Sequence, residues 1–455
     1  MMITFFVFSK WLSYNGRLII LLLGSFYFYI HWMPIFLPLL IWIILFNFFY
    51  GRFLMKHPSK KGLLAIGILV DLLPLLFFKY TNFIISNINA VVGLIQPEFR
   101  ILPMALILPL GISFFTFQAI AYLVDCSKKD MTGYSLLEFG VFIAFWPQLI
   151  AGPILHHSEI IPQLKNPSQK QIQTNNLIIG ASVFIMGATK KLLIADKLAP
   201  MADYVFSNPG NATSISAFLA AISYTFQLYF DFSGYCDMAY GSAKMFNIEL
   251  PFNFLSPYKS RDIQEFWRHW HITLSRWLRD YIYIPLGGRR TTKKRTFINL
   301  LITFLVGGIW HGAGWNFIIW GILHGVSVGI CHLRANSSRH LPKIIGGIIT
   351  MFIVIVGWVF FRASSVSDAL VLLSKIAFWD TFRLRTGLEK EAILLCFSLS
   401  ILVWFAPNSK EIMQEITSGK RILLWGGMLG ILCPLVLLCL LAKDLPASPF
   451  LYFQF

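Results

Sequence analysis

The stretch TFINLLITFLVGGIWHGAGWNFIIWGILHGVSVGICHL, residues 296–333, decides the fold class because it contains no Asp, Glu, Lys or Arg. One helix needs roughly 20 apolar residues to cross a bilayer, so this run is long enough for two. We expect those helices over 297–311 and 313–332. The sequence therefore places this part of the chain in a membrane.

The rest of the chain has the same apolar character. Of its 455 residues, 56% are hydrophobic and 16% aromatic, and the mean hydropathy is +0.67. A soluble core of this size does not need so much apolar surface. Further stretches of spanning length lie at 17–32, 33–50, 62–78, 103–124, 136–151, 176–195, 213–230, 344–361, 391–406 and 421–442. We predict an all-α polytopic membrane protein, a single domain over 1–455 with about 10–12 transmembrane helices.

The charge pattern agrees with a membrane protein. The formal net charge is +17, and basic residues cluster between apolar stretches at 52–61 and 289–295, which predicts cytoplasmic loops there. Membrane lipids or a phosphorylated cytoplasmic substrate explain the basic excess, and nucleic-acid binding is not needed. The first apolar stretch carries no cleavage signature, so we expect it to be retained.

Several kinds of chemistry find no support in the sequence. The six cysteines lack metal-ligand spacing, so we expect no metal site. No phosphate-binding lysine loop, nucleophile elbow or HExxH motif is present, which disfavours ATP-driven transport and serine-hydrolase chemistry. Pro and Gly interrupt the apolar stretches 108–115 and 146–155. Because irregular backbone at membrane depth must be covered by protein or water, these stretches predict broken or re-entrant helices around a cavity.

The segment 259–295 differs from its surroundings, with ten basic and three acidic residues. Plotted as one helix, its part FWRHWHITLSRWLRDYIYIPLGGRR (266–290) places Trp267, Trp270 and His271 on an aromatic face and Arg268 and Arg279 on a basic face. This pattern predicts an amphipathic helix along the cytoplasmic surface. On the aromatic face, burial of His271 would favour the neutral imidazole that can accept a proton, although a packing role would also suit it.

A second histidine lies within the uncharged stretch. His311 is flanked by glycines at 307, 308, 312 and 314, and an ionisable side chain at membrane depth predicts a functional site. Glycines would let a backbone or a substrate approach His311 closely. His324 would lie on another face of a continuous helix, so we expect a packing role for it and no metal pair. Asp231 and Asp237 could cap a helix, pair with a basic side chain or orient a histidine.

Long motifs resemble those of the membrane-bound O-acyltransferase family, and of its bacterial branch that O-acetylates polysaccharides. The resemblance rests on PLGISFFTFQAIAYLVD (109–125), FWPQLIAGPILHHSEIIPQL (145–164), YFDFSGYCDMAYG (229–241), LPFNFLSPYKSRDIQEFWRHWHITLSRWLRDYIYIPLGG (250–288), WHG (310–312), WGILHG (320–325) and SPFLYFQF (448–455).

This resemblance implies helices around a central funnel, with the catalytic histidine of WHG, His311, at its narrow part. The histidine of WHITLS (270–275) is His271, which we expect to support the catalysis. We expect substrate to be bound by Trp267, Arg268, Trp270, Ser275, Arg279, Trp310 and Asp231.

The resemblance also implies an activity. The chain would take acetyl from cytoplasmic acetyl-CoA, with no permanently bound cofactor, and pass it across the bacterial inner membrane. A partner, an extracytoplasmic polysaccharide O-acetyltransferase, would place it on a polymer, with peptidoglycan slightly preferred over alginate. D-alanyl transfer from a carrier protein to teichoic acid is an alternative within the family. A transporter or flippase without chemistry is an alternative from another class.

Overall fold

The computed structural model describes residues 5–6, 11–58, 60–128, 131, 133–166, 171–334, 342–378, 384, 386–441 and 450–451. These residues form helices joined by turns and irregular segments, with no β-strand among them, which confirms the all-α class. The closing motif 448–455 lies outside the described residues except for Phe450 and Leu451.

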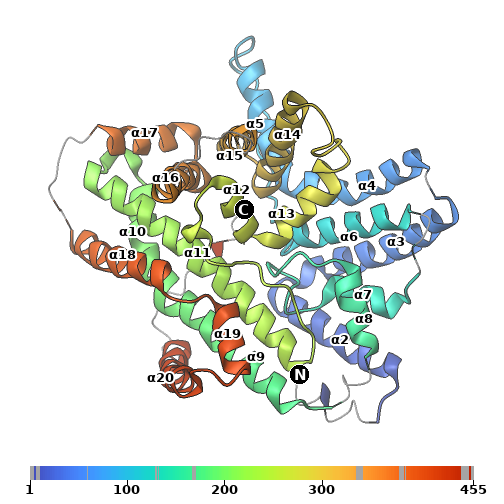
Figure 1. The fold of residues 1–455 in the computed structure, drawn as a ribbon. Coiled ribbons are helices and arrows are strands. Elements are labelled where there is room, and N and C mark those ends of the chain that lie inside the picture. The colour runs from blue at the N-terminus through green and yellow to red at the C-terminus, as the bar shows by residue number, and fades with distance from the viewer. Residues whose placement is uncertain are drawn as a thin grey trace. The chain divides into compact units, whose positions relative to one another are not determined.

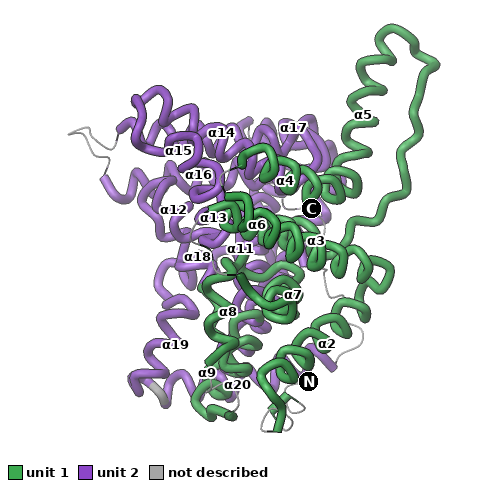
Figure 2. The backbone as a smooth tube through the Cα atoms, turned by 90° about the vertical axis from the view of Figure 1, so that its right-hand side faces the viewer, with its two compact units in different colours: residues 1–181, 239–251 green, residues 182–238, 252–455 purple. Residues whose placement is uncertain are grey.

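The chain divides into two compact units, which Figure 2 shows in separate colours. Unit 1 comprises 1–181 and 239–251, and unit 2 comprises 182–238 and 252–455, so the division falls within two long helices, α9 and α11. Up to α9 the helices are α2 (Tyr14–Trp32), α3 (Leu37–Lys56), α4 (Lys61–Leu75), α5 (Thr81–Val92), α6 (Ile112–Cys126), α7 (Leu136–Ala144), α8 (His157–Lys165) and α9 (Thr174–Thr189).

The later helices belong mainly to unit 2. They are α10 (Asp196–Phe206), α11 (Ser214–Met245), α12 (Ile263–His269), α13 (Ile272–Leu278), α14 (Lys293–His311), α15 (Trp315–Arg334), α16 (Lys343–Arg362), α17 (Val366–Ala377), α18 (Gly387–Phe405), α19 (Ser409–Thr417) and α20 (Ile422–Leu441). Single π-helical turns extend α4, α9 and α13 at Leu76–Tyr80, Lys190–Ala195 and Arg279–Tyr283.

Several helices are built to cross a membrane. Among the described residues, six are long and apolar enough: Pro34–Lys56, Lys61–Val92, Thr174–Phe206, Trp315–Arg334, Lys343–Arg362 and Leu423–Leu441. A seventh span results if α18 and α19, which meet at a 51° bend, are counted together. The structure is thus a multi-pass membrane protein.

The count is lower than the ten to twelve spans that the apolar stretches predict. Three predicted stretches, 17–32, 213–230 and 297–311, do form long helices (α2, α11 and α14), but these are not among the six. Two other stretches are broken. Residues 100–109 are extended rather than helical, and the helix that follows, α6, has only 15 residues. Residues 136–151 form a nine-residue helix, α7, followed by turns. Apolar length alone does not register these breaks, whereas Pro103, Pro109 and Pro147 mark them.

The Pro/Gly-rich stretch 146–155 is irregular, as predicted, and nearly all of its residues are buried. Two hydrogen bonds tie this stretch to neighbouring helices: the Trp146 N–H donates to Ser25 Oγ of α2 at 3.2 Å, and the Gln148 side chain donates to the Phe142 carbonyl of α7 at 2.8 Å. Protein groups therefore cover this non-helical backbone, as a membrane-embedded segment requires.

In unit 2, helices α14, α15 and α16 pack side by side, and α12 packs on α15 (Figure 1). The segment expected to be one amphipathic helix is instead two short helices, α12 and α13, separated at Trp270 and His271. The expectation of a continuous helix was wrong here, and the break changes where His271 points.

Candidate active site

The turn between α14 and α15 positions His311. The helix α14 begins after Thr292, whose hydroxyl caps the Arg295 N–H, and ends at His311. A Cβ on Gly312 would lie 2.1 Å from the Phe317 ring, and one on Gly308 would lie 2.4 Å from the Phe317 carbonyl oxygen. The glycines therefore let α15 pack directly against α14. The space we expected for a substrate is filled at these two glycines by the chain itself.

His311 is almost fully buried, in a setting made of aromatic rings. Its ring centroid lies 4.9 Å from Trp310, 4.9 Å from Trp320 and 5.1 Å from Phe361, each at a steep angle. Asn316 fixes this turn, because its amide donates to the Phe360 and Ala363 carbonyls at 3.2 and 2.9 Å. The start of α15 is thereby tied to the end of α16 beside His311.

His271 sits at the break between α12 and α13 in a left-handed conformation, with φ of 43°. A left-handed backbone conformation is uncommon for residues other than glycine, so contacts with the surrounding structure must stabilise it. The support comes from Asn253, whose Oδ1 accepts from the Thr273 N–H and hydroxyl at 3.0 Å each and lies 3.4 Å from His271 Nδ1. The Asn253 carbonyl also accepts from the Ile272 N–H at 3.1 Å.

The rings of the two predicted catalytic histidines both pack against Trp310. The His271 ring centroid is 6.3 Å from Trp310, which in turn is 4.9 Å from His311. His271 has no exposed surface, and burial lowers its pKa to about 3, so its imidazole is neutral near pH 7. The structure thus gathers His271, Trp310 and His311 in one buried cluster of unit 2.

His324 has the packing role expected of it. Its Nδ1 accepts from Trp267 Nε1–H at 3.3 Å, and its ring contacts Trp320 at 4.8 Å. A Cβ on Gly357 would lie 2.7 Å from His324 Nε2, so the backbone of α16 closes against it. Because the chain turns at 312–314, His311 and His324 flank Trp320, which a continuous helix would not allow.

The predicted substrate-binding residues do not gather at one place: some are buried among aromatic rings, and others are exposed. Trp270 is buried among aromatic rings, 4.9 Å from Trp358 and 5.0 Å from Phe254. The Ser275 hydroxyl donates to the Trp270 carbonyl at 3.5 Å. Arg268 and Arg279 are exposed, and Arg279 forms a two-pronged pair with its neighbour Asp280.

Asp231 is held by ion pairing within unit 2. It lies in the middle of α11, where Lys191 contacts it at 2.6 Å and the Leu451 N–H donates to it at 3.1 Å. Asp237, also mid-helix, pairs with Lys190 at 2.6 Å. Of the three roles open to these two aspartates, the structure shows pairing with a basic side chain, and the sequence had not singled out the lysines.

Comparison with known proteins gives this cluster its context. The family model described as MBOAT, membrane-bound O-acyltransferase family, matches residues 22–366. The chain belongs to the membrane-bound O-acyltransferase family. As a member it is an acyltransferase, which counts against a transporter or flippase without chemistry.

Relatives within the membrane-bound O-acyltransferase family differ in their named activities. The chain is 43% identical over 385 residues to a peptidoglycan O-acetyltransferase of Helicobacter pylori, covering 78% of this chain and 72% of the relative. It is 41% identical over 418 residues to a probable alginate O-acetylase AlgI of Pseudomonas syringae pv. tomato, covering 89% and 79%. A teichoic acid D-alanyltransferase of Bacillus subtilis is 27% identical over 290 residues, covering 61% and 70%.

Two residues that support the backbone beside these histidines were not predicted from the sequence. Asn253 supports the backbone at His271, and Asn316 anchors the turn after His311. Asn316 stands two residues after Gly314, at the start of an apolar stretch. A single amide side chain next to a turn at membrane depth could therefore have been singled out from the sequence. Asn253 carried no such signal, because it looks like an ordinary loop residue.

Proposed function

We propose that this protein takes an acetyl group from cytoplasmic acetyl-CoA and passes it across the bacterial inner membrane. At the outer face, a separate extracytoplasmic transferase would place the acetyl group on a polysaccharide hydroxyl. The observation that carries the proposal is the buried cluster of His311, Trp310 and His271. Similarity to relatives named as peptidoglycan and alginate acetylating enzymes supports acetyl as the acyl group.

Acyl transfer from a thioester needs a base and a means to stabilise negative charge. In the proposed step the accepting oxygen attacks the thioester carbon, His311 takes the hydroxyl proton, and the C–S bond breaks as the C–O bond forms. The proton returns to the departing thiolate. His271, buried beside the same tryptophan, would help to orient the reacting groups.

Outside this cluster, positively charged side chains would attract the acyl donor, acetyl-CoA. Arg268 and Arg279 are exposed on the segment that carries His271, and their guanidinium groups suit the phosphates of coenzyme A. Trp267, Trp270 and Trp310 would act by shaping the buried surroundings of the histidines. We favour peptidoglycan as the final polymer, with alginate next, because the identity to the peptidoglycan enzyme is slightly higher.

The test is transfer or hydrolysis of radiolabelled acetyl-CoA by purified protein in nanodiscs, with and without a candidate partner. His311→Gln should lower the rate by about 100-fold or more, since general acid–base catalysis contributes about 10²–10⁴. His271→Gln should lower it less. His332→Ala, at a partly exposed histidine on the same helix as His324, is the matched control and should keep full activity.

The outcomes separate the alternatives. Full activity in the His311→Gln protein, with an unchanged melting temperature, would remove the catalytic assignment. If no form uses acetyl-CoA but a D-alanyl carrier protein is discharged, the D-alanyl alternative replaces the proposal, and the teichoic acid relatives already give that alternative a basis.

A further inference from the structure

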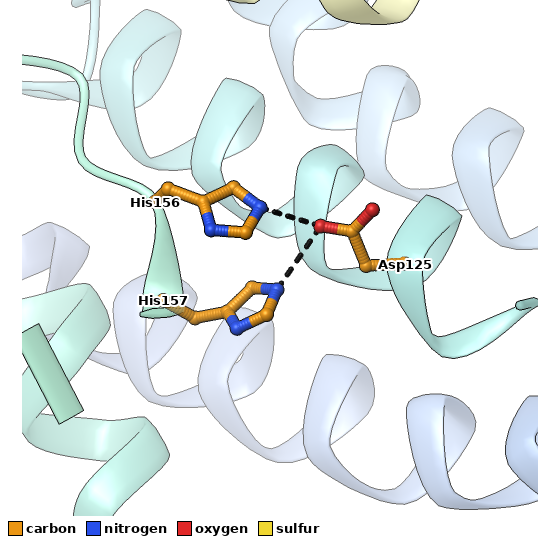
Figure 3. Close-up of side chains that lie close together, drawn as sticks. All are labelled: Asp125, His156 and His157. Carbon is orange, nitrogen blue, oxygen red and sulfur yellow. Dashed lines mark hydrogen bonds and ion pairs between the residues drawn. The ribbon is translucent and has the colours of Figure 1, made fainter. Parts of the chain in front are cut away.

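A second histidine cluster lies in unit 1, apart from the residues used above. Asp125 is near the C-terminal end of α6, and His156 and His157 stand at the start of α8. His156 Nε2 and His157 Nε2 lie 2.6 and 3.0 Å from the same oxygen of Asp125, Oδ2. Figure 3 shows the two rings turning the same edge toward that carboxylate.

We infer that Asp125, His156 and His157 form a binding site for a divalent transition-metal ion of the zinc type. Two imidazole nitrogens and one carboxylate oxygen are ligands that Zn²⁺, Co²⁺ and Ni²⁺ bind well. The three ligand atoms lie within 4.8 Å of one another. In a tetrahedral zinc site such atoms stand about 3.3 Å apart, so small side-chain movements complete the geometry. This inference does not depend on the acetyl-transfer proposal.

The surroundings of the cluster are those of a built site. The other ring nitrogen of each histidine is held by a hydroxyl: His157 Nδ1 lies 2.9 Å from the Tyr134 oxygen, and His156 Nδ1 contacts Ser158 Oγ. Partners of this kind fix the ring orientation and the tautomer of metal-ligating histidines. With Nε2 on the metal, Nδ1–H would donate to these hydroxyls. The 3.3 Å contact from the Ser158 N–H to His156 would be given up.

Burial and access also fit. Asp125 and His157 are buried, whereas the His156 side chain is 31% exposed, which leaves an entry path on one side. Lys128 pairs with the other oxygen of Asp125 and is 65% exposed, so it can move into solvent when a cation binds. In the absence of metal, that ammonium group helps balance the carboxylate. Lys128 is therefore a competitor of the metal rather than a ligand.

A metal ion at this site would stabilise the segment of unit 1 that lies between its ligands. Between its ligands lie α7 and the irregular buried stretch 145–155, whose backbone gains few helical hydrogen bonds. A metal bound to α6 and to the start of α8 would close this loop and stabilise it, because the ion binds the folded state and not the unfolded chain. Sequence spacing did not predict the site, since Asp125 is far along the chain from the two histidines.

The experiment uses full-length protein in detergent, purified through a tag without histidine, stripped with a chelator and dialysed. Zn²⁺ or Co²⁺ is added, the protein is desalted, and its metal content is measured by mass spectrometry. Wild type should retain about one ion per chain. Co²⁺ should give visible absorption bands from nitrogen and oxygen ligation, and Zn²⁺ should raise the melting temperature.

Variants decide between a metal site and a plain ion-pair network. His156→Ala and His157→Ala should each lose most of the bound ion and the thermal shift. His57→Ala, at a histidine whose ring nitrogen contacts the Phe53 carbonyl instead, should behave like wild type. Lys128→Ala should bind Co²⁺ several-fold more tightly, and it should fold normally because the Lys128 side chain is exposed. Equal metal retention in all variants, or none in wild type and Lys128→Ala, would overturn the inference.

Discussion

Two asparagines beside the predicted catalytic histidines should lose stability to different degrees on the same substitution. Asn253 uses its side-chain oxygen as an acceptor for Thr273, and its amide faces Cys236 Sγ at 3.4 Å. Asn316 uses its amide as a donor to two carbonyls. Replacing either residue by Asp preserves shape, removes both amide protons and adds a negative charge.

The magnitudes follow from the partners. At Asn253 the carboxylate would still accept from the Thr273 N–H and hydroxyl, and the Cys236 thiol can donate to its other oxygen, so the fold should survive. At Asn316 the carboxylate would face the Phe360 and Ala363 carbonyl oxygens, and loss of two buried hydrogen bonds alone costs about 2–6 kcal/mol. Thermal unfolding in detergent should therefore show a larger loss of stability for Asn316→Asp than for Asn253→Asp, because the new carboxylate at position 253 is buried but keeps its two donors from Thr273.

The surviving variant should also change the pH dependence of acyl transfer. A negative charge 3.4 Å from His271 favours its imidazolium and should raise its pKa from about 3 by about one to three pH units. The acid limb of the pH–rate profile should shift to higher pH by the same amount. A profile that coincides with wild type, in a protein that binds substrate normally, would refute the positioning role of Asn253 and the part given to His271.

Three further changes test the packing and charge of unit 2. Gly312→Ala should lower the free energy of unfolding by about 1–3 kcal/mol, because its new methyl group meets the Phe317 ring. Gly426→Ala is the control: its methyl group would meet no atom within 4 Å, so thermal melts should show no change or a slight stabilisation. Lys191→Met should cost about 3–5 kcal/mol because Asp231 stays buried without its cation, measured by denaturation in detergent. His271 should make stability fall as pH drops below about 6.5, by up to about 1.4 kcal/mol per pH unit, because the unfolded chain protonates His271 before the folded chain does. His271→Gln should remove this contribution and make the fall in stability with pH shallower.

The membrane character and the helical class could be predicted because they depend on composition, which every residue reports. The position of His311 could also be predicted, since an ionisable residue among glycines in an uncharged stretch is unusual wherever it occurs. The number of spans could not be predicted as well. Extended backbone at 100–109 is as apolar as a helix would be, and hydropathy does not distinguish the two conformations.

The break at His271 could not be found by a helical plot. No Gly or Pro marks the break between α12 and α13, so no helix-breaking residue separates them in the sequence. What stabilises the left-handed residue is Asn253, 18 positions earlier, together with the Leu255 N–H, which donates to the His269 carbonyl. Such support comes from tertiary structure, so no pattern within the segment reveals it.

The two histidine clusters differ in what surrounds them, and this difference predicts different chemistry. Aromatic rings enclose His311, which in the proposed step takes up and releases a proton, and burial keeps His271 neutral beside it. His156 and His157 instead share one carboxylate and have hydroxyls at their other nitrogens, which fixes their rings and suits lasting coordination. The surroundings of each imidazole, rather than the number of histidines, separate a catalytic hypothesis from a metal-binding one.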